Sequence, residues 1–250
     1  MIDWERAEVS GLLADEIHVA PSLGKAVGGF DLAIAYTRSE PLARGLRSLL
    51  PRVVVHDPGP PDGFGHAAEW LAQPIAAEGI AVVATVPPCV PGEAEAAAAE
   101  RWLGKLPPAF LAIHPGSGSP EKNWPATFYD RLAESLSSGR PWLLAEGPAQ
   151  APPAVGGRGA IRIRSAHPRV LGAVLRRAGL YVGNDSGASH LAAAWGAPTL
   201  ALFGPTDPAV WSPLGSGVRV VRSASGRMRD LELNDVIAAA RAVQALAADC

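Results

Sequence analysis

The segment from Leu180 to Phe203 reads LYVGNDSGASHLAAAWGAPTLALF. Its first part, Leu180–Gly183, is a short apolar run of the kind that forms a buried strand. Ala188–Trp195 has the spacing of a helix, and Thr199–Phe203 is a second apolar run. A strand, a helix and a strand at this distance predict two parallel strands joined by a crossover helix.

The same alternation continues on both sides of this segment. Short apolar runs, each closed by Gly, Pro or Asp, precede stretches with helical spacing, which predicts an α/β fold with parallel sheets and helices on both faces. Right-handed crossovers would place every strand-to-helix loop on one edge of the sheet. In the second part we expect strands at Phe110–His114, Trp142–Ala145, Ile161–Ile163 and Val218–Val221, and helices at Pro125–Ser138, Arg169–Ala178 and Leu231–Ala248.

The first part of the chain follows the same pattern less regularly. Its expected strands are Ile17–Ala20, Asp31–Tyr36, Arg52–His56 and Ala81–Val86, with helices at Pro41–Leu50 and Gly65–Ala77. A proline-rich and Ala/Glu-rich segment, Pro87–Pro108, then interrupts the alternation around an expected helix, Glu93–Leu103. Such a change of composition usually marks a connection between domains. We therefore predict domains at residues 1–90 and 109–250, joined by residues 91–108.

Composition narrows the class of protein. The 22 Lys and Arg against 24 Asp and Glu give a net charge of -2, so a nucleic-acid partner is not expected. Hydrophobic residues make up 48% of the 250 residues, enough for packed cores. No apolar run approaches the ~18 residues of a membrane span, and the N-terminus lacks an apolar signal core. Two cysteines, Cys89 and Cys250, form neither a disulfide framework nor a metal pattern. We expect a cytoplasmic protein without a bound metal.

One loop with binding potential follows the expected strand Phe110–His114. It reads His-Pro-Gly-Ser-Gly-Ser-Pro-Glu-Lys-Asn-Trp-Pro over residues 114–125. Small residues let backbone N–H groups approach an anion, Ser117 and Ser119 add hydroxyl donors, and Lys122 adds a positive charge, which together suit a phosphate or diphosphate. The alternative, an ordinary Gly/Ser loop with a surface lysine, is about equally well supported by spacing alone.

A second candidate loop follows Leu180–Gly183. Asp185 or Ser186 can cap the next helix, Gly187 permits close approach of a ligand, and His190 lies one turn into that helix. Free N–H groups at a helix N-terminus make an anion site. The alternative is a capping aspartate beside a partly buried histidine. Residues 204–208 follow the expected strand Thr199–Phe203. Taken alone, their sequence predicts only a rigid turn.

Taken together, these motifs resemble glycosyltransferase family 9, the ADP-heptose:lipopolysaccharide heptosyltransferases. The resemblance rests on Gly183-Asn184-Asp185-Ser186-Gly187, His190 to Ala194, Gly196-Ala197-Pro198, and residues 202–208 with Trp211. The upstream run His114 to Ser117, with Lys122 to Pro125, looks like the donor-phosphate loop of the same family. The resemblance covers most of residues 110–213 and, more weakly, residues 30–79.

The resemblance implies a GT-B-like architecture of two Rossmann-like domains, the N-terminal one shortened, whose C-terminal domain binds a nucleotide-sugar. It implies that the loop of Ser117, Gly118 and Lys122 contacts the donor phosphates and that Ser186 and Gly187 meet the diphosphate. Asp185 would meet the sugar hydroxyls or the site backbone, His190 would support the site, and Glu146 would begin the nucleoside loop. The loop from Glu146 to Gln150 departs from the family pattern, which leaves the choice of base open.

The implied reaction is an inverting, metal-independent and cofactor-free transfer of a heptose-like sugar from an ADP-sugar to a lipopolysaccharide core-type acceptor. A lipid-linked acceptor would also imply peripheral contact with the inner membrane. Members of the family begin with a strand and a Gly-Asp loop that carries the catalytic base, and nothing in Met1–Gly29 resembles it. The chain is therefore expected to start inside the family's first domain, and the catalytic residue stays unassigned.

Three carboxylates near expected strand ends, Glu40, Asp57 and Asp62, are possible substitutes for the base, although each is better explained as a surface residue. The missing loop supports an alternative function, a non-catalytic sugar-nucleotide-binding protein or a partner subunit of a complete transferase. A GT-B-like epimerase or hydrolase is a further alternative, which would need extra carboxylates in the site.

Overall fold

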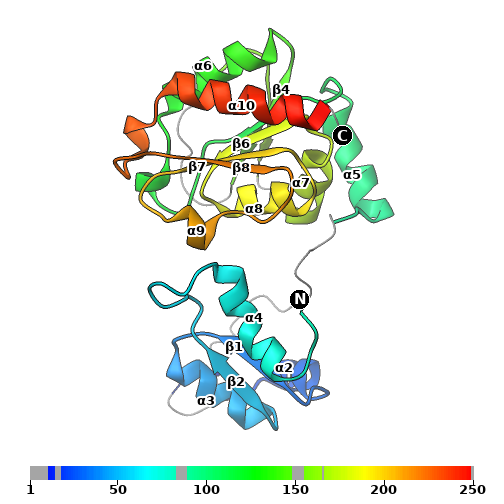
Figure 1. Cartoon of the computed structure of the whole chain (residues 1–250). Helices are drawn as coiled ribbons and strands as arrows, with labels where there is room; N and C mark the ends of the chain where they lie inside the picture. The colour runs from blue at the N-terminus through cyan, green and yellow to red at the C-terminus, as the bar shows by residue number, and fades with distance from the viewer. Residues whose placement is uncertain (1–10, 15–17, 83–88, 148–154, 165, 249–250) are drawn as a thin grey trace. The chain divides into compact units, whose positions relative to one another are not determined.

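The computed structural model describes residues 11–14, 18–82, 89–147, 155–164 and 166–248. The chain divides into two compact units, residues 1–84 and 85–250 (Figure 1). Each unit is built around a sheet of parallel strands.

The first unit contains a two-stranded parallel sheet. Strand β1 (Ala33–Tyr36) pairs with β2 (Val53–His56), with Ala33 opposite Val53. The helices are α2 (Pro21–Val27), α3 (Glu40–Leu49) and α4 (Ala67–Ala77). The two strands and the helices α3 and α4 confirm the sequence prediction to within two residues at each end. The expected strand at Ile17–Ala20 is wrong over residues 18–20, and the expected strand at Ala81–Val86 is wrong over residues 81–82, because neither stretch has regular structure. Residue 17 and residues 83–86 lie outside the described residues.

The second unit contains six parallel strands in the order β5-β4-β3-β6-β7-β8. Their bounds are β3 (Leu111–His114), β4 (Trp142–Glu146), β5 (Ala160–Arg164), β6 (Leu180–Asn184), β7 (Thr199–Phe203) and β8 (Val218–Arg222). All six were expected from the sequence. Strands β3, β4, β6 and β7 are buried at every residue, which explains why they read as unbroken apolar runs instead of alternating ones.

Helices cover both faces of this sheet, as predicted (Figure 1). On one face lie α6 (Ala126–Ser137) and α10 (Leu233–Ala248), packed on Leu111 and Ile113 of β3. On the other lie α5 (Glu93–Leu103), α7 (Pro168–Leu175) and α8 (Gly187–Ala194), packed on Ala112. The alternating side chains of β3 thus serve two separate cores. The short elements are η1 (Pro120–Lys122), α9 (Pro208–Trp211) and η2 (Met228–Asp230).

Helix α5 belongs to the second unit, whereas the sequence placed it in a connection over residues 91–108. Ala99 on this helix is only 1% exposed and joins the core beneath α7. Arg169 of α7 also donates to Glu95 of α5 at 2.5 Å. The second unit begins at residue 85, so the segment that the sequence assigned to a connection belongs to this unit.

The strand order places one edge of the sheet in a special position. From β3 the chain proceeds outward to β4 and β5, and then returns to lay β6 against the free side of β3, with His114 opposite Gly183. In open parallel sheets, ligands bind where the strand order reverses in this way, outside the carboxyl ends of the strands. The two candidate loops from the sequence follow β3 and β6 and therefore meet at this point.

Candidate functional site

Three loops converge on one carboxylate oxygen at the carboxyl edge of the second sheet. Lys122 Nζ, from the loop after β3, donates to Asp185 Oδ2, after β6, at 2.9 Å. Thr206 Oγ1, after β7, donates to the same oxygen at 2.8 Å. The Asp185 side chain is 9% exposed and that of Lys122 is 30% exposed. The structure thus joins two residues that the sequence predicted separately, 63 positions apart.

Asn184, the last residue of β6, binds the loop after β3 and helix α6. Its side chain is completely buried, and Oδ1 accepts from the Trp124 amide at 3.2 Å and from Tyr129 Oη at 2.8 Å. Nδ2 donates to the carbonyl of Pro115 at 2.7 Å and to Asn123 Oδ1 at 3.3 Å. These bonds use both donors and both acceptor positions of the amide, so Asn184 holds the loop after β3 against the end of β6.

The hydrogen-bond partners of the Ser117 side chain lie in its own loop. Its Oγ lies 2.8 Å from Asn123 Oδ1 and 2.6 Å from the Ser119 carbonyl, and one hydroxyl proton can serve only one of them at a time. Gly118 is exposed, and a Cβ there would meet nothing within 4 Å. The prediction that Ser117 and Gly118 contact phosphates stays a prediction, and both lie in the predicted loop beside Lys122.

The N-terminus of α8 lies directly after Asp185. Ser186 occupies the N-cap position with extended backbone, yet its side chain makes no capping hydrogen bond. Its Oγ is enclosed and has no hydrogen-bond partner among the described residues. Gly187 is exposed with open space at its Cβ position, and His190 is an exposed residue of the first turn. The helix end beside Lys122 therefore offers backbone N–H groups to an anion.

Glu146 ends β4 and carries a charge that two arginines balance. Its side chain is 7% exposed, and it accepts from Arg162 at 2.7 Å and from Arg164 at 2.5 Å, both on β5. The parallel register places Arg164 opposite Glu146. Burying this carboxylate is tolerated because both oxygens have cationic partners. Residues 148–150 of the predicted nucleoside loop lie outside the described residues.

The proposed substitutes for a catalytic base lie in the first unit and are engaged or exposed. Arg38 binds Asp57 through two nitrogens, and this hydrogen bonding holds the pKa of Asp57 below its ordinary value. Glu40 accepts from Arg47 at 3.0 Å, and Asp62 is exposed. A carboxylate with a lowered pKa is a weaker base, so Asp57 is poorly suited to the role.

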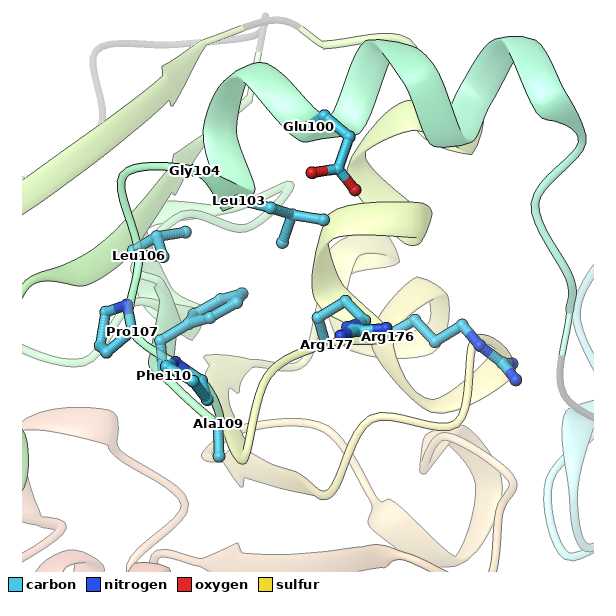
Figure 2. Close-up of a pocket in the computed structure, with 10 residues that line it drawn as sticks. Glu100, Leu103, Gly104, Leu106, Pro107, Ala109, Phe110, Arg176 and Arg177 are labelled. Carbon is cyan, nitrogen blue, oxygen red and sulfur yellow. The ribbon is translucent and has the colours of Figure 1, made fainter.

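A cavity of the second unit lies at the opposite edge of the sheet. It measures about 630 Å³ and includes Glu100, Leu103, Phe110, Arg176 and Arg177. Figure 2 shows Glu100 and Leu103 on α5, and Arg176 and Arg177 beyond the end of α7. Phe110 precedes β3, so this cavity borders the amino ends of the strands. It contains none of the predicted site residues, and the strand-order argument favours the carboxyl edge.

Within the part of the chain that the structure describes, His, Cys, Asp and Glu side chains do not gather in groups of three or more that could hold a metal ion. Each helix in that part falls short of the length and apolarity needed to cross a membrane.

Sequence reasoning missed two residues that build the site, Asn184 and Thr206. Both lie inside motifs that carried the resemblance, so motif membership was the available signal. Their roles depend on which strands are neighbours, because Asn184 contacts α6 and the loop after β3, and Thr206 reaches Asp185 from the loop after β7.

Comparison with known proteins supports the resemblance drawn from these motifs. The family model of glycosyltransferase family 9 (heptosyltransferase) matches residues 169–240. Lipooligosaccharide heptosyltransferase 2 of Haemophilus influenzae is 30% identical over 150 residues, which are 53% of this chain and 41% of that protein. The match thus spans about two fifths of the length of this curated relative.

Solved structures share the fold. A family 9 glycosyl transferase from Veillonella parvula superposes with a TM-score of 0.74 at 20% identity, covering 96% of this chain and 79% of its own. ADP-heptose lipopolysaccharide heptosyltransferase II of Escherichia coli gives 0.71 at 20% identity, covering 90% and 80%. The E. coli heptosyltransferase WaaC with ADP gives 0.67 at 21% identity, covering 96% and 79%. The predicted α/β, GT-B-like fold class is confirmed.

These findings and the loop motifs agree on the same region of the second unit. The matched residues 169–240 include Asp185, Ser186, Gly187, His190 and Thr206. The resemblance is thereby confirmed over residues 169–240, which match the family model of glycosyltransferase family 9 (heptosyltransferase).

Proposed function

We propose that this chain acts as a glycosyltransferase that moves a heptose-like sugar from an ADP-sugar to a lipopolysaccharide core-type acceptor. The observation that carries the proposal is the convergence of Lys122, Asp185 and Thr206 beside the N-terminus of α8. The names of the relatives support the class of donor and acceptor, since they include an ADP-heptose lipopolysaccharide heptosyltransferase and a heptosyltransferase with ADP.

Charge on the departing diphosphate is the main demand of such a transfer. The Lys122 ammonium has three protons, and its contact with Asp185 occupies one of them. The remaining protons and the N–H groups at the start of α8 can bind phosphate oxygens as negative charge develops on the leaving group. In this proposal the reaction needs no metal ion, because the lysine and the helix N-terminus supply the stabilising charge.

Asp185 is suited to hold the transferred sugar. Both protein donors, Lys122 and Thr206, use its Oδ2, and Oδ1 has no partner among the described residues. An ionised carboxylate oxygen in this position can accept hydrogen bonds from sugar hydroxyls, which fixes the orientation of the anomeric carbon. Inversion at that carbon would then require the acceptor hydroxyl to approach from the face opposite the diphosphate.

A second candidate function is a sugar-nucleotide-binding protein that does not turn over, or a partner subunit of a complete transferase. The observation that favours it is the state of the possible bases in the first unit, because Asp57 and Glu40 are both held in ion pairs with arginines. Both functions require the same donor site in the second unit.

The test is a calorimetric titration of the protein with ADP, UDP and ADP-heptose, followed by an assay of ADP release with a lipid A–core acceptor. ADP-selective binding and acceptor-dependent release are the expected results. A repeat with EDTA should leave release unchanged, since the proposal uses no metal. Binding without release would favour the non-catalytic alternative, and absence of any nucleotide binding would overturn both functions.

A further inference from the structure

His114 is a buried histidine beside the candidate site. The proposed function gives this side chain no role. It is the last residue of β3, at the point where the strand order reverses, and it lies opposite Gly183 of β6. Its side chain is nine-tenths buried, with 9% of its surface exposed. A polar ring in this place needs partners on both nitrogens or a ligand for the one that lacks a partner.

One nitrogen of the ring has a partner that determines the tautomer. Nδ1 lies 2.8 Å from the carbonyl oxygen of Ala145 on β4. A carbonyl can only accept, so Nδ1 must carry a proton and donate it. Burial lowers the pKa of His114, which keeps the ring neutral near pH 7. Nε2 is then a bare acceptor.

Nε2 has no hydrogen-bond partner among the described residues, and it is not sealed inside the protein. The side-chain atoms there that are both enclosed and unpaired are Trp102 Nε1 and Ser186 Oγ, so Nε2 retains access to solvent. Its access depends on glycine. A Cβ at Gly116 would lie 3.3 Å from Nε2, and a Cβ at Gly147 would lie 3.7 Å from Cε1.

These two glycines belong to different loops. Gly116 is part of the predicted phosphate loop after β3, and Gly147 follows Glu146 in the predicted nucleoside loop after β4. The exposed edge of the His114 ring therefore lies between the loops expected to hold the two ends of a nucleoside diphosphate. The part of such a ligand between its phosphates and its base is the ribose, whose hydroxyl groups donate hydrogen bonds.

We propose that His114 is a donor-contacting residue whose Nε2 accepts a hydrogen bond from a ribose hydroxyl of the bound nucleotide. The proposal rests on the proposed function, because it assumes a nucleotide in the site of the second unit. It adds a specificity determinant, since a neutral imidazole acceptor selects a ligand that offers a hydroxyl at this position.

The test compares ligands and variants in the same titration. The ligands are ADP, 2′-deoxy-ADP and 3′-deoxy-ADP. His114→Asn keeps an N–H group near the position of Nδ1 for the Ala145 carbonyl but removes the acceptor at Nε2. His114→Gln has a longer side chain, whose amide group can come near the position of Nε2. His167→Asn is the matched control, because His167 is exposed and caps α7, a role that asparagine also fills.

We expect the wild-type protein to bind one deoxy analogue roughly 3- to 10-fold more weakly than ADP, the size of one hydrogen bond. His114→Asn should bind ADP more weakly by the same factor and should no longer distinguish ADP from that analogue. His114→Gln should recover part of the preference, and His167→Asn should behave as wild type.

Two outcomes would overturn the proposal alone. One is equal binding of ADP and both deoxy analogues by the wild-type protein, which requires no variant to fold. The other is a hydroxyl preference that persists in His114→Asn while its melting curve matches wild type. Failure of the wild-type protein to bind ADP at all would overturn the proposed function together with this inference, so the two failures are distinguishable.

Discussion

In both units of the chain, polar loops follow the parallel strands, but the ion pairs in these loops differ in how far they are buried. In the second unit, Lys122 and Asp185 pair with side chains that are 30% and 9% exposed, above a fully buried Asn184. In the first unit, Arg38 and Asp57 pair at the ends of β1 and β2 with side chains that are 73% and 43% exposed.

This difference indicates in which unit the loops after the strands are held in a fixed arrangement that could bind a ligand. Exposed ion pairs contribute little, because water and salt screen the charges and two long side chains must be ordered. A buried polar network is costly unless each member is satisfied, so it holds one arrangement of its loops. In the second unit, buried polar groups lie together at one edge of the sheet, and we place the donor site at this edge.

The largest effect is expected from Asn184→Ala. The substitution leaves Tyr129 Oη, the Trp124 amide and the Pro115 carbonyl without their partner in a buried place. We expect a loss of about 3 kcal/mol in the free energy of unfolding, measured by urea denaturation with circular dichroism. The control is Asn234→Ala on the exposed start of α10, which should unfold like wild type. Equal curves for both variants would mean that the network does not stabilise the unit.

A smaller effect on stability but a clear effect on ligand affinity is expected from Lys122→Met. It removes the cation beside α8 and keeps most of the side-chain length. We expect ADP to bind roughly 10- to 100-fold more weakly, which corresponds to the loss of a charge-assisted hydrogen bond. Calorimetry provides the measurement, and Lys105→Met, an exposed lysine after α5, is the control. Unchanged affinity in Lys122→Met would contradict the assignment of the phosphate site.

Thr206→Val should produce a third, weaker effect. Valine has nearly the same shape but cannot donate to Asp185 Oδ2, so only the hydrogen bond from Lys122 to this oxygen is kept among the described residues. We expect a loss of about 1 kcal/mol in the free energy of unfolding, with Thr127→Val on the exposed face of α6 as the control. A loss equal to that of Asn184→Ala would show that Thr206 carries more of the network than its single hydrogen bond suggests.

The smallest effect is expected in the first unit. Arg38→Gln removes the partner of Asp57 at an exposed edge, where the pair contributes little to folding. The thermal midpoint should stay within experimental error of wild type, and raising the salt concentration should not separate the two proteins. A marked drop in the midpoint would remove the contrast between the two edges.

Much of the fold could be predicted because the strands of the second unit are buried on both faces. Burial on both faces requires unbroken apolar runs, as in Thr199–Phe203, and such runs are visible without any tertiary information. The failure at residues 18–20 has the opposite cause, since a short apolar run can also pack as an irregular segment. The sequence predicted helix α5 but did not assign it to the second unit, because its packing partner α7 lies about 70 residues further along the chain.

The candidate site was predicted in part for a related reason. Gly-rich turns after strands and an Asp-Ser pair before a helix are local patterns, so Lys122, Asp185, Ser186 and Gly187 could be proposed from spacing and motif. Asn184 and Thr206 act across strands, and the free nitrogen of His114 becomes apparent only when the Ala145 carbonyl is found beside the other nitrogen.

Local residue patterns were thus sufficient for the α/β class, for most elements and for the resemblance to glycosyltransferase family 9. They could not establish that β6 returns to the free side of β3, which brings residues 122 and 185 within hydrogen-bonding distance. The physical reason is range. Helix and strand formation depends on the nearest few residues, whereas a buried polar network depends on which distant segments exclude water together.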